Sequence, residues 1–277
     1  FNSMVNCIAQ QMDQRIGELS DINISCDPTA YLPFVEILTE PDRFMAIVPA
    51  ERALEVAKAI KEKYCLEMGK VRNRLPIMVG LVFAESHTPL TALLDAGRRM
   101  LKMGVQSRET WVIDKIESKD ENRYYRIEFK NGITWSVPAL MGNQKIEDIW
   151  YPNFYVQENI KGANEPQKRQ TAFKGPDGWL VHVKELEPGD QVMITPSRFD
   201  FEYLTSAALR FEIGYDQETG KRLSGPGYKG KLSRPYYLEQ LDKLQDLIKT
   251  LQKGLSRSQI YQIIDLIETK RIEWSDY

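Results

Sequence analysis

Apolar residues in the first fifty positions follow a helical period and then a strand period. Spacings of three and four residues predict an amphipathic helix over residues 4–19. Two short apolar runs at 34–38 and 44–48 then flank the polar stretch 39–43. Apolar runs of strand length around a polar turn are typical of a hairpin. We therefore expect a strand, a turn that contains Pro41, and a second strand.

The next fifty residues predict a helix, a buried strand and another helix. Pro49 is placed to start a helix, because its fixed backbone angle suits the first turn. Residues 77–83 are apolar on both faces, which is typical of a central strand that is covered on both sides or tightly on one. Thr88 and Pro89 then open another helix. The core-facing residues of this helix are expected to be Leu90, Leu93, Leu94, Gly97 and Leu101.

This order of elements predicts an α+β fold for residues 1–104. Helices that return onto one face of a mostly antiparallel sheet give a ferredoxin-like arrangement, as in the palm of polymerases and cyclases. The first strand of such a sheet would precede Phe1. We therefore expect the chain to be a fragment of a longer protein.

The pattern changes in residues 105–232, which predict a β-rich extension with mobile loops. Asn131 and Gly132 separate two strand-length runs, and this pair readily adopts the positive backbone angles of a tight hairpin. The polar stretch 157–178 indicates a mobile loop. Strands are expected at 124–129, 133–137, 179–183, 191–194 and 208–213.

Residues 233–277 predict a C-terminal helical region. The glycine-rich stretch 224–231 precedes it as a flexible connector. Apolar residues at helical spacing indicate two amphipathic helices, which are separated near Gly254. Ser256 is suited to cap the second of them.

Composition is that of a soluble globular protein, with 42% hydrophobic and 27% charged residues. A net charge of -2 argues against a uniformly basic nucleic-acid coat, although 37 Lys and Arg residues leave room for a local basic groove. Cys7, Cys26 and Cys65 are widely spaced, which fits free thiols in a reducing cytoplasm better than a disulfide or zinc framework. No apolar run approaches the length of a membrane span, and no signal peptide is visible.

Common catalytic and metal-binding patterns are poorly represented. The two histidines, His87 and His182, lie about 95 residues apart and lack ligand spacing, which disfavours a histidine-rich metal site. His87 is expected to cap a helix or to lie on the surface. No Gly-x-Ser-x-Gly nucleophile elbow is present.

Two groups of residues bear on nucleic-acid binding. The first is basic and could contact a phosphate backbone or simply be a solvated linker; it comprises Arg222, Lys229, Lys231 and Arg234. The second is aromatic and is expected in the core or at a domain interface instead of stacking on bases; it comprises Phe199, Phe201, Tyr203 and Phe211.

The turn Glu40-Pro41-Asp42-Arg43 lies where a palm enzyme presents acidic side chains to two metal ions. Those ions bridge the triphosphate and activate the attacking hydroxyl. Taken alone, the four residues are only an exposed polar turn. The helix, strand and helix that follow favour a palm whose catalytic turn has degenerated.

Several segments resemble one known family, the large subunit of type III CRISPR–Cas effector complexes (Cas-ten, Csx-eleven branch). The palm-like segments are 34–50, 75–84 and His87-Thr88-Pro89-Leu90. The run Arg198-Phe199-Asp200-Phe201-Glu202-Tyr203-Leu204, together with Arg210-Phe211-Glu212-Ile213 and Ser256-Arg257-Ser258-Gln259-Ile260-Tyr261, is similar to the Csx-eleven branch. The resemblance covers most of the chain, with about 80 residues more specific.

In active members of that family the turn reads Gly-Gly-Asp-Asp, and the palm makes cyclic oligoadenylates from ATP with Mg or Mn. By this resemblance, Glu40 and Pro41 replace the glycines, Asp42 retains the first acid, and Arg43 replaces the second. Glu40 adds bulk, and Pro41 removes an N–H where the nucleotide would approach. Arg43 places a positive charge where a divalent ion needs an anion. Asp42 alone would hold a metal ion only weakly.

The resemblance implies a non-catalytic scaffold in an RNA-guided antiviral complex, with other effector subunits, guide RNA and target RNA as partners, a cytoplasmic location and no membrane partner. The alternatives are a nucleotidyl cyclase with an altered metal turn, and a nucleotide sensor in which Arg43 binds phosphate without a metal. The phosphate-binding candidates are Arg43, Lys229, Lys231, Arg234 and Arg257, with Lys270 and Arg271 also available. No catalytic residue or cofactor is assigned.

Overall fold

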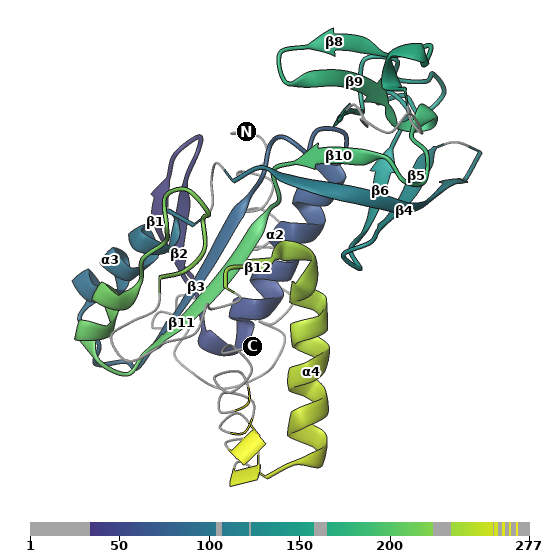
Figure 1. Cartoon of the computed structure of the whole chain (residues 1–277). Coiled ribbons are helices and arrows are strands. Elements are labelled where there is room, and N and C mark those ends of the chain that lie inside the picture. The colour runs from purple at the N-terminus through teal and green to yellow at the C-terminus, as the bar shows by residue number, and fades with distance from the viewer. Residues whose placement is uncertain are drawn as a thin grey trace.

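The computed structural model describes residues 34–103, 107–121, 123–157, 165–223 and 234–256, and some residues between 258 and 270 (Figure 1). The fold is mixed α/β, with mostly sheet and few helices in the described part. The expected helix over 4–19 lies outside the described residues, as do the connector 224–231 and Arg257.

The predicted hairpin around residue 41 is confirmed. Strand β1 (Val35–Thr39) pairs antiparallel with β2 (Phe44–Ile47), with an irregularity in register between Glu36 and Leu38. Among the described strands these two form a sheet of their own.

A three-stranded sheet forms the centre of the molecule. Strand β3 (Met78–Ala84) pairs with β11 (Arg198–Leu204) in parallel over its whole length. The short strand β12 (Tyr236–Tyr237) pairs antiparallel with the other edge of β11. The sheet therefore joins segments that lie far apart in the chain, and the chain reaches β11 through helix α3 (Leu90–Met100) and a long β-rich insertion.

Helices cover both faces of this sheet (Figure 1). Helices α2 (Ala53–Glu67) and α4 (Leu241–Gly254) share a core with Val79 and Phe199, whereas α3 packs with Met78 on the opposite face. The expectation that the helices share one face is therefore wrong for α2 and α3. The reason is that β3 is apolar on both faces, so each face needs a covering layer.

Small residues let α3 lie close to the sheet. Its buried positions are Ala92, Ala96 and Met100, while Leu90, expected in the core, is 49% exposed. Gly80 of β3 permits this approach, because a Cβ atom there would lie 2.8 Å from the Cβ of Met100. The helix thus buries a stripe of small side chains and one methionine.

The insertion between α3 and β11 forms a seven-stranded antiparallel sheet in the order β6-β5-β4-β10-β7-β9-β8. Its strands are β4 (Glu109–Lys119), β5 (Tyr124–Phe129), β6 (Thr134–Pro138), β7 (Asn153–Val156), β8 (Phe173–Gly175), β9 (Gly178–His182) and β10 (Gln191–Ile194). This β-rich unit has its own hydrophobic core around Trp111, Trp135 and Phe154. The β5–β6 hairpin confirms the Asn131-Gly132 prediction, with φ of +78° at Gly132.

The structure differs from the expected β-rich extension in three places. Strand β11 falls within the expected range 105–232, yet it pairs with β3 and β12 and not with the seven-stranded sheet. Residues 208–213, expected as a strand, lie in the 3-10 helix η4 (Ala207–Glu212) and in Ile213, which follows it. Part of the expected loop 157–178 forms β8. The other 3-10 helices are η1 (Ala50–Arg52), η2 (Pro166–Lys168), η3 (Val183–Glu185) and η5 (Leu238–Gln240).

Polar and aromatic contacts join the β-rich unit to the central sheet. Glu109 of β4 accepts hydrogen bonds from Trp111 Nε1 (2.8 Å) and Tyr237 Oη (2.7 Å), and it pairs with Arg198. Glu239 pairs with Arg72 and accepts from Trp135 Nε1 at 2.9 Å. These ion pairs and hydrogen bonds cross the junction and hold the two units against each other.

Candidate functional site

The turn at residues 40–43 is exposed, and its Asp42 and Arg43 side chains pair with each other. Its backbone is closed by hydrogen bonds from Glu40 N to Arg43 O (2.8 Å) and from Arg43 N to Glu40 O (3.3 Å). The Asp42 carboxylate pairs with Arg43 Nε at 3.3 Å, and the two side chains are 69% and 61% exposed. An ion pair this exposed contributes about 0–1 kcal/mol, so the turn has little electrostatic organisation.

Asp42 does not meet the other ligands that a magnesium or manganese ion would need. Within the described ranges, no group of three His, Cys, Asp or Glu side chains is arranged to hold a metal ion. Mg²⁺ requires near-octahedral oxygen coordination, and one carboxylate beside an arginine does not provide it. The described residues at the turn therefore do not fit a metal-dependent palm site.

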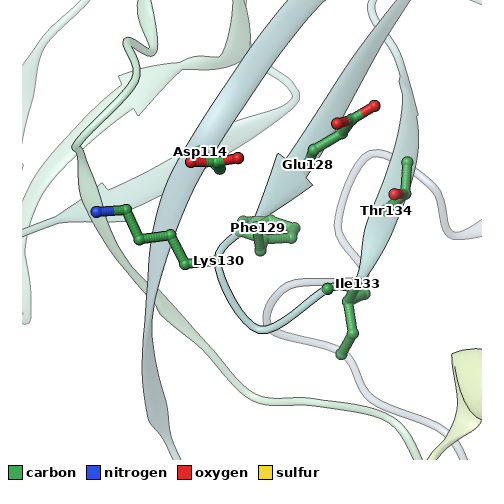
Figure 2. Close-up of a pocket in the computed structure, with 7 residues that line it drawn as sticks. Asp114, Glu128, Phe129, Lys130, Ile133 and Thr134 are labelled. Atoms are coloured by element: carbon green, nitrogen blue, oxygen red, sulfur yellow. The ribbon is translucent and has the colours of Figure 1, made fainter.

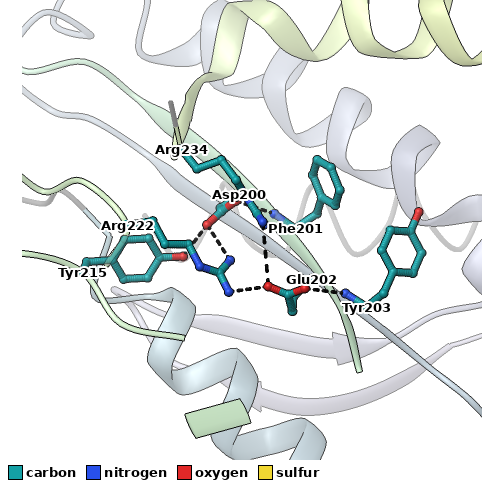
Figure 3. Close-up of polar contacts among 7 residues, drawn as sticks. All are labelled: Asp200, Phe201, Glu202, Tyr203, Tyr215, Arg222 and Arg234. Atoms are coloured by element: carbon teal, nitrogen blue, oxygen red, sulfur yellow. Dashed lines mark hydrogen bonds and ion pairs between the residues drawn. The ribbon is translucent and has the colours of Figure 1, made fainter. Parts of the chain in front are cut away.

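Among the phosphate-binding candidates, Arg234 is described and belongs to a buried ion-pair network (Figure 3). Asp200 of β11 is fully buried and accepts hydrogen bonds from Arg234 Nε (2.6 Å), Arg222 Nη1 (3.1 Å) and Tyr215 Oη (2.6 Å). Glu202, on the same face of β11, pairs with both arginines. Lys229 and Lys231 lie outside the described residues.

The geometry of this network indicates a structural role. The two carboxylates are saturated by guanidinium groups, so neither is free to act as a general base or a metal ligand. Burial and the adjacent Asp200 carboxylate raise the pKa of Tyr215. Arg222 N also donates to Arg234 O at 2.9 Å. The network thus ties Arg222 and Arg234 to the central strand.

A hollow of about 460 Å³ opens at the β5–β6 turn (Figure 2). Its lining residues are Asp114, Glu128, Phe129, Lys130, Gly132, Ile133 and Thr134. The lining contains no histidine, cysteine or serine that could serve as a nucleophile or base. The hollow is a feature of the hairpin surface and carries no assignment.

The loop between β6 and β7, residues 139–152, is the most distinctive surface in the described part of the chain. Five large apolar side chains on it are solvent-exposed: Met141 (44%), Ile146 (57%), Ile149 (64%), Trp150 (73%) and Tyr151 (46%). Solvent-exposed apolar groups gathered on one short segment mark an interaction surface. We call this segment the 139–152 loop.

The backbone of the 139–152 loop is held from beneath by buried polar groups. The Asp148 carboxylate accepts from the backbone N–H groups of Trp150 (3.2 Å) and Tyr151 (3.0 Å), and it pairs with Lys70 Nζ at 2.7 Å. Burial tends to raise the pKa of Asp148, but the hydrogen bonds from Lys70 and Tyr151 N outweigh it and hold this pKa below 3.8. Asn153 Nδ2 donates to Trp150 O at 2.6 Å.

His182 is another anchor of this loop and not a metal ligand or catalytic base. It is fully buried, and its Nε2 lies 2.8 Å from Asp148 O and 3.2 Å from Tyr151 O. Lys184 N donates to Nδ1 at 3.3 Å, which places the ring proton on Nε2. His87, expected as a cap or a surface residue, is exposed.

Sequence reasoning missed this loop, although a signal was present. Residues 149–151 read Ile-Trp-Tyr, a run of large apolar side chains directly before Pro152, outside any predicted strand. Turns between strands are usually polar. An apolar run in such a place is therefore a usable marker of an interaction surface.

No helix within the described ranges is long and apolar enough to cross a membrane. Comparison with protein-family models, with curated proteins and with solved structures found no match to this chain.

Proposed function

We propose that this chain is a non-catalytic scaffold subunit of an RNA-guided type III CRISPR effector complex, and that it binds a neighbouring protein subunit through the 139–152 loop. The observation that supports this proposal is an apolar surface on a fixed backbone. Trp150 is 73% exposed, while Asp148 and His182 beneath it are buried and hydrogen-bonded. The type of complex is proposed from a resemblance to its large subunit, which is carried by residues 34–50, 75–84 and 198–204.

A fixed loop with exposed aromatic residues suits protein binding. Tryptophan and tyrosine supply most of the energy at protein interfaces, and a preformed backbone reduces the entropy lost on binding. The acids of the loop are already paired, Asp148 with Lys70 and Glu147 with Lys184 at 3.1 Å. The loop is therefore nearly uncharged, which favours a protein partner over a nucleic acid.

The turn at residues 40–43 supports the non-catalytic half of the proposal. Asp42 is paired with Arg43 within the turn, and Pro41 removes an N–H that could approach a phosphate. A palm-type unit that retains the hairpin, helix and strand with only one of the two acids would contribute its shape to the assembly.

The proposal is tested by purifying the tagged chain from its own host. We expect stoichiometric protein subunits together with short RNA of uniform length. Trp150→Ala should release the protein subunits, whereas Phe173→Ala, which removes another exposed aromatic residue of the β-rich unit, should retain them. Purification of the chain alone, without protein or RNA partners, would overturn the proposal.

Incubation with ATP separates the scaffold from the two alternatives. The chain with Mg²⁺ or Mn²⁺ should yield no cyclic oligoadenylate, and any such product contradicts the non-catalytic reading. Calorimetry with ATP in the presence of a chelator tests whether the chain is a metal-independent nucleotide sensor. Micromolar binding that Arg43→Ala abolishes would favour the sensor over the scaffold.

A further inference from the structure

We propose that the surface formed by α3 and η4 binds single-stranded RNA. The residues of this α3–η4 patch are Arg98, Arg99, Lys102, Arg210 and Phe211. The choice of RNA over DNA rests on the proposed function. The binding chemistry itself, an exposed ring surrounded by cations, stands on the geometry of the patch alone.

Phe211 supplies an exposed aromatic platform. It was expected in the core or at a domain interface, yet its side chain is 61% exposed. The guanidinium carbons of Arg210 and Arg99 lie 4.1 Å and 5.2 Å from the centre of its ring. An exposed aromatic ring beside cations can accept a nucleobase by stacking.

The two arginines beside Phe211 are held in place before any ligand arrives. Asp95 Oδ2 lies 2.9 Å from Arg99 Nε and 3.4 Å from Arg210 Nε, and Arg210 Nη1 also donates to the carbonyl of Ala207. The contacts with Asp95 use the Nε edges of both arginines, and Arg210 also uses Nη1. The guanidinium groups are therefore positioned at little further cost in side-chain entropy when a phosphate binds.

Arg98 and Lys102 extend the positive charge along the same end of α3. Both are exposed, and neither forms an ion pair with another described residue. Of the four cations, Arg99 and Arg210 share one carboxylate, that of Asp95, and Glu212 follows Phe211 in the sequence, so these residues together carry a net positive charge. This differs from the network around Asp200, where every arginine is matched by a buried acid.

A single strand fits this arrangement better than a duplex. Bases in a duplex are stacked on each other, so their faces are unavailable to Phe211, whereas a single strand exposes both its bases and its phosphates. A purely structural role is also defined: Arg98 and Arg99 lie in the last turn of α3 and would stabilise the helix dipole. If this were their only role, replacing these arginines would lower the stability of the chain and leave its RNA binding unchanged.

The test measures the affinity of the whole chain for a fluorescent oligouridine of about 20 nucleotides by anisotropy. Removing one stacking platform with Phe211→Ala should weaken binding by about 5- to 150-fold. The double variant Arg98→Glu and Lys102→Glu should weaken it and lower the slope of log affinity against log salt by about 1.4. Duplex RNA of the same length should compete poorly.

A matched control reverses two exposed lysines of the β-rich unit, Lys130 and Lys174, which gives the same change in net charge. This control should bind like the unaltered chain, and thermal denaturation should show all variants folded. The α3–η4 patch is refuted if Phe211→Ala binds like the unaltered chain, or if the control loses as much affinity as the patch variant.

Failure of the patch and failure of the scaffold give different results. If the host complex contains RNA and the patch variants bind oligouridine normally, the α3–η4 patch proposal is refuted and the scaffold proposal stands. If the patch variants lose oligouridine binding but the chain purifies from its host without partners, the scaffold proposal is refuted. The α3–η4 patch then stands as a surface that binds single strands.

Discussion

Gly80→Ala tests how closely α3 lies against the central sheet. A Cβ atom at residue 80 would lie 2.8 Å from the Cβ of Met100, whose side chain is fully buried. Carbon atoms prefer separations of about 3.5–4.0 Å, so the helix or the strand must move by roughly 1 Å. Neither atom belongs to the mobile end of a side chain. The strain must therefore be relieved by the backbone.

The magnitude follows from two opposing effects. Overpacking of this kind costs about 1–3 kcal/mol, while alanine restricts the unfolded chain and restores about 0.4–1 kcal/mol. Net destabilisation of about 1–2 kcal/mol is expected. For a chain of this size class, that lowers Tm by about 2–8 °C.

Gly142→Ala is the matched control. Gly142 has no atom within 4 Å of the position of a Cβ, and its φ is not positive. Only the unfolded-state effect remains, so the free energy of unfolding should stay unchanged or rise slightly. Circular dichroism melts and urea unfolding at 25 °C measure both variants. A Gly80→Ala protein as stable as Gly142→Ala would refute the close contact between α3 and β3.

Three further variants test buried polar groups. Burial raises the pKa of Tyr64, which donates to Leu75 O at 2.6 Å, to about 12. The contribution of Tyr64 to stability is therefore complete below pH 10 and is lost as pH rises to about 12. In the Tyr64→Phe variant, the free energy of unfolding should depend less on pH across that range. The lowered pKa of Asp148 means that its contribution is lost as pH falls below 3.8, so Asp148→Asn should show a weaker acid dependence of stability, measured by urea unfolding. Asp200→Asn leaves two buried guanidinium groups without their full counter-charge and should cost about 3–5 kcal/mol in urea unfolding, whereas Asp216→Asn, at an exposed turn, should cost far less.

Local patterns identified the elements whose signals lie within a few residues. The hairpin around Pro41, the helix after Pro49 and the strand in residues 77–83 are all present. Asn131 and Gly132 form the expected turn, because the backbone angles of a tight hairpin depend on the turn residues themselves. Residues 208–213 were misjudged, because their apolar residues alternate as in a strand, yet the chain forms the 3-10 helix η4 there.

Tertiary contacts decided the features on which the functional proposals depend. The sequence by itself established the local elements and a turn in which Asp42 is retained and Arg43 stands where the resemblance places the second acid of an active palm. Only the folded chain paired β3 with β11, matched Arg234 with Asp200, and left Trp150 and Phe211 exposed. The physical reason is that burial and ion pairing depend on which distant segments come into contact. The local periodicity of apolar residues does not specify those long-range contacts.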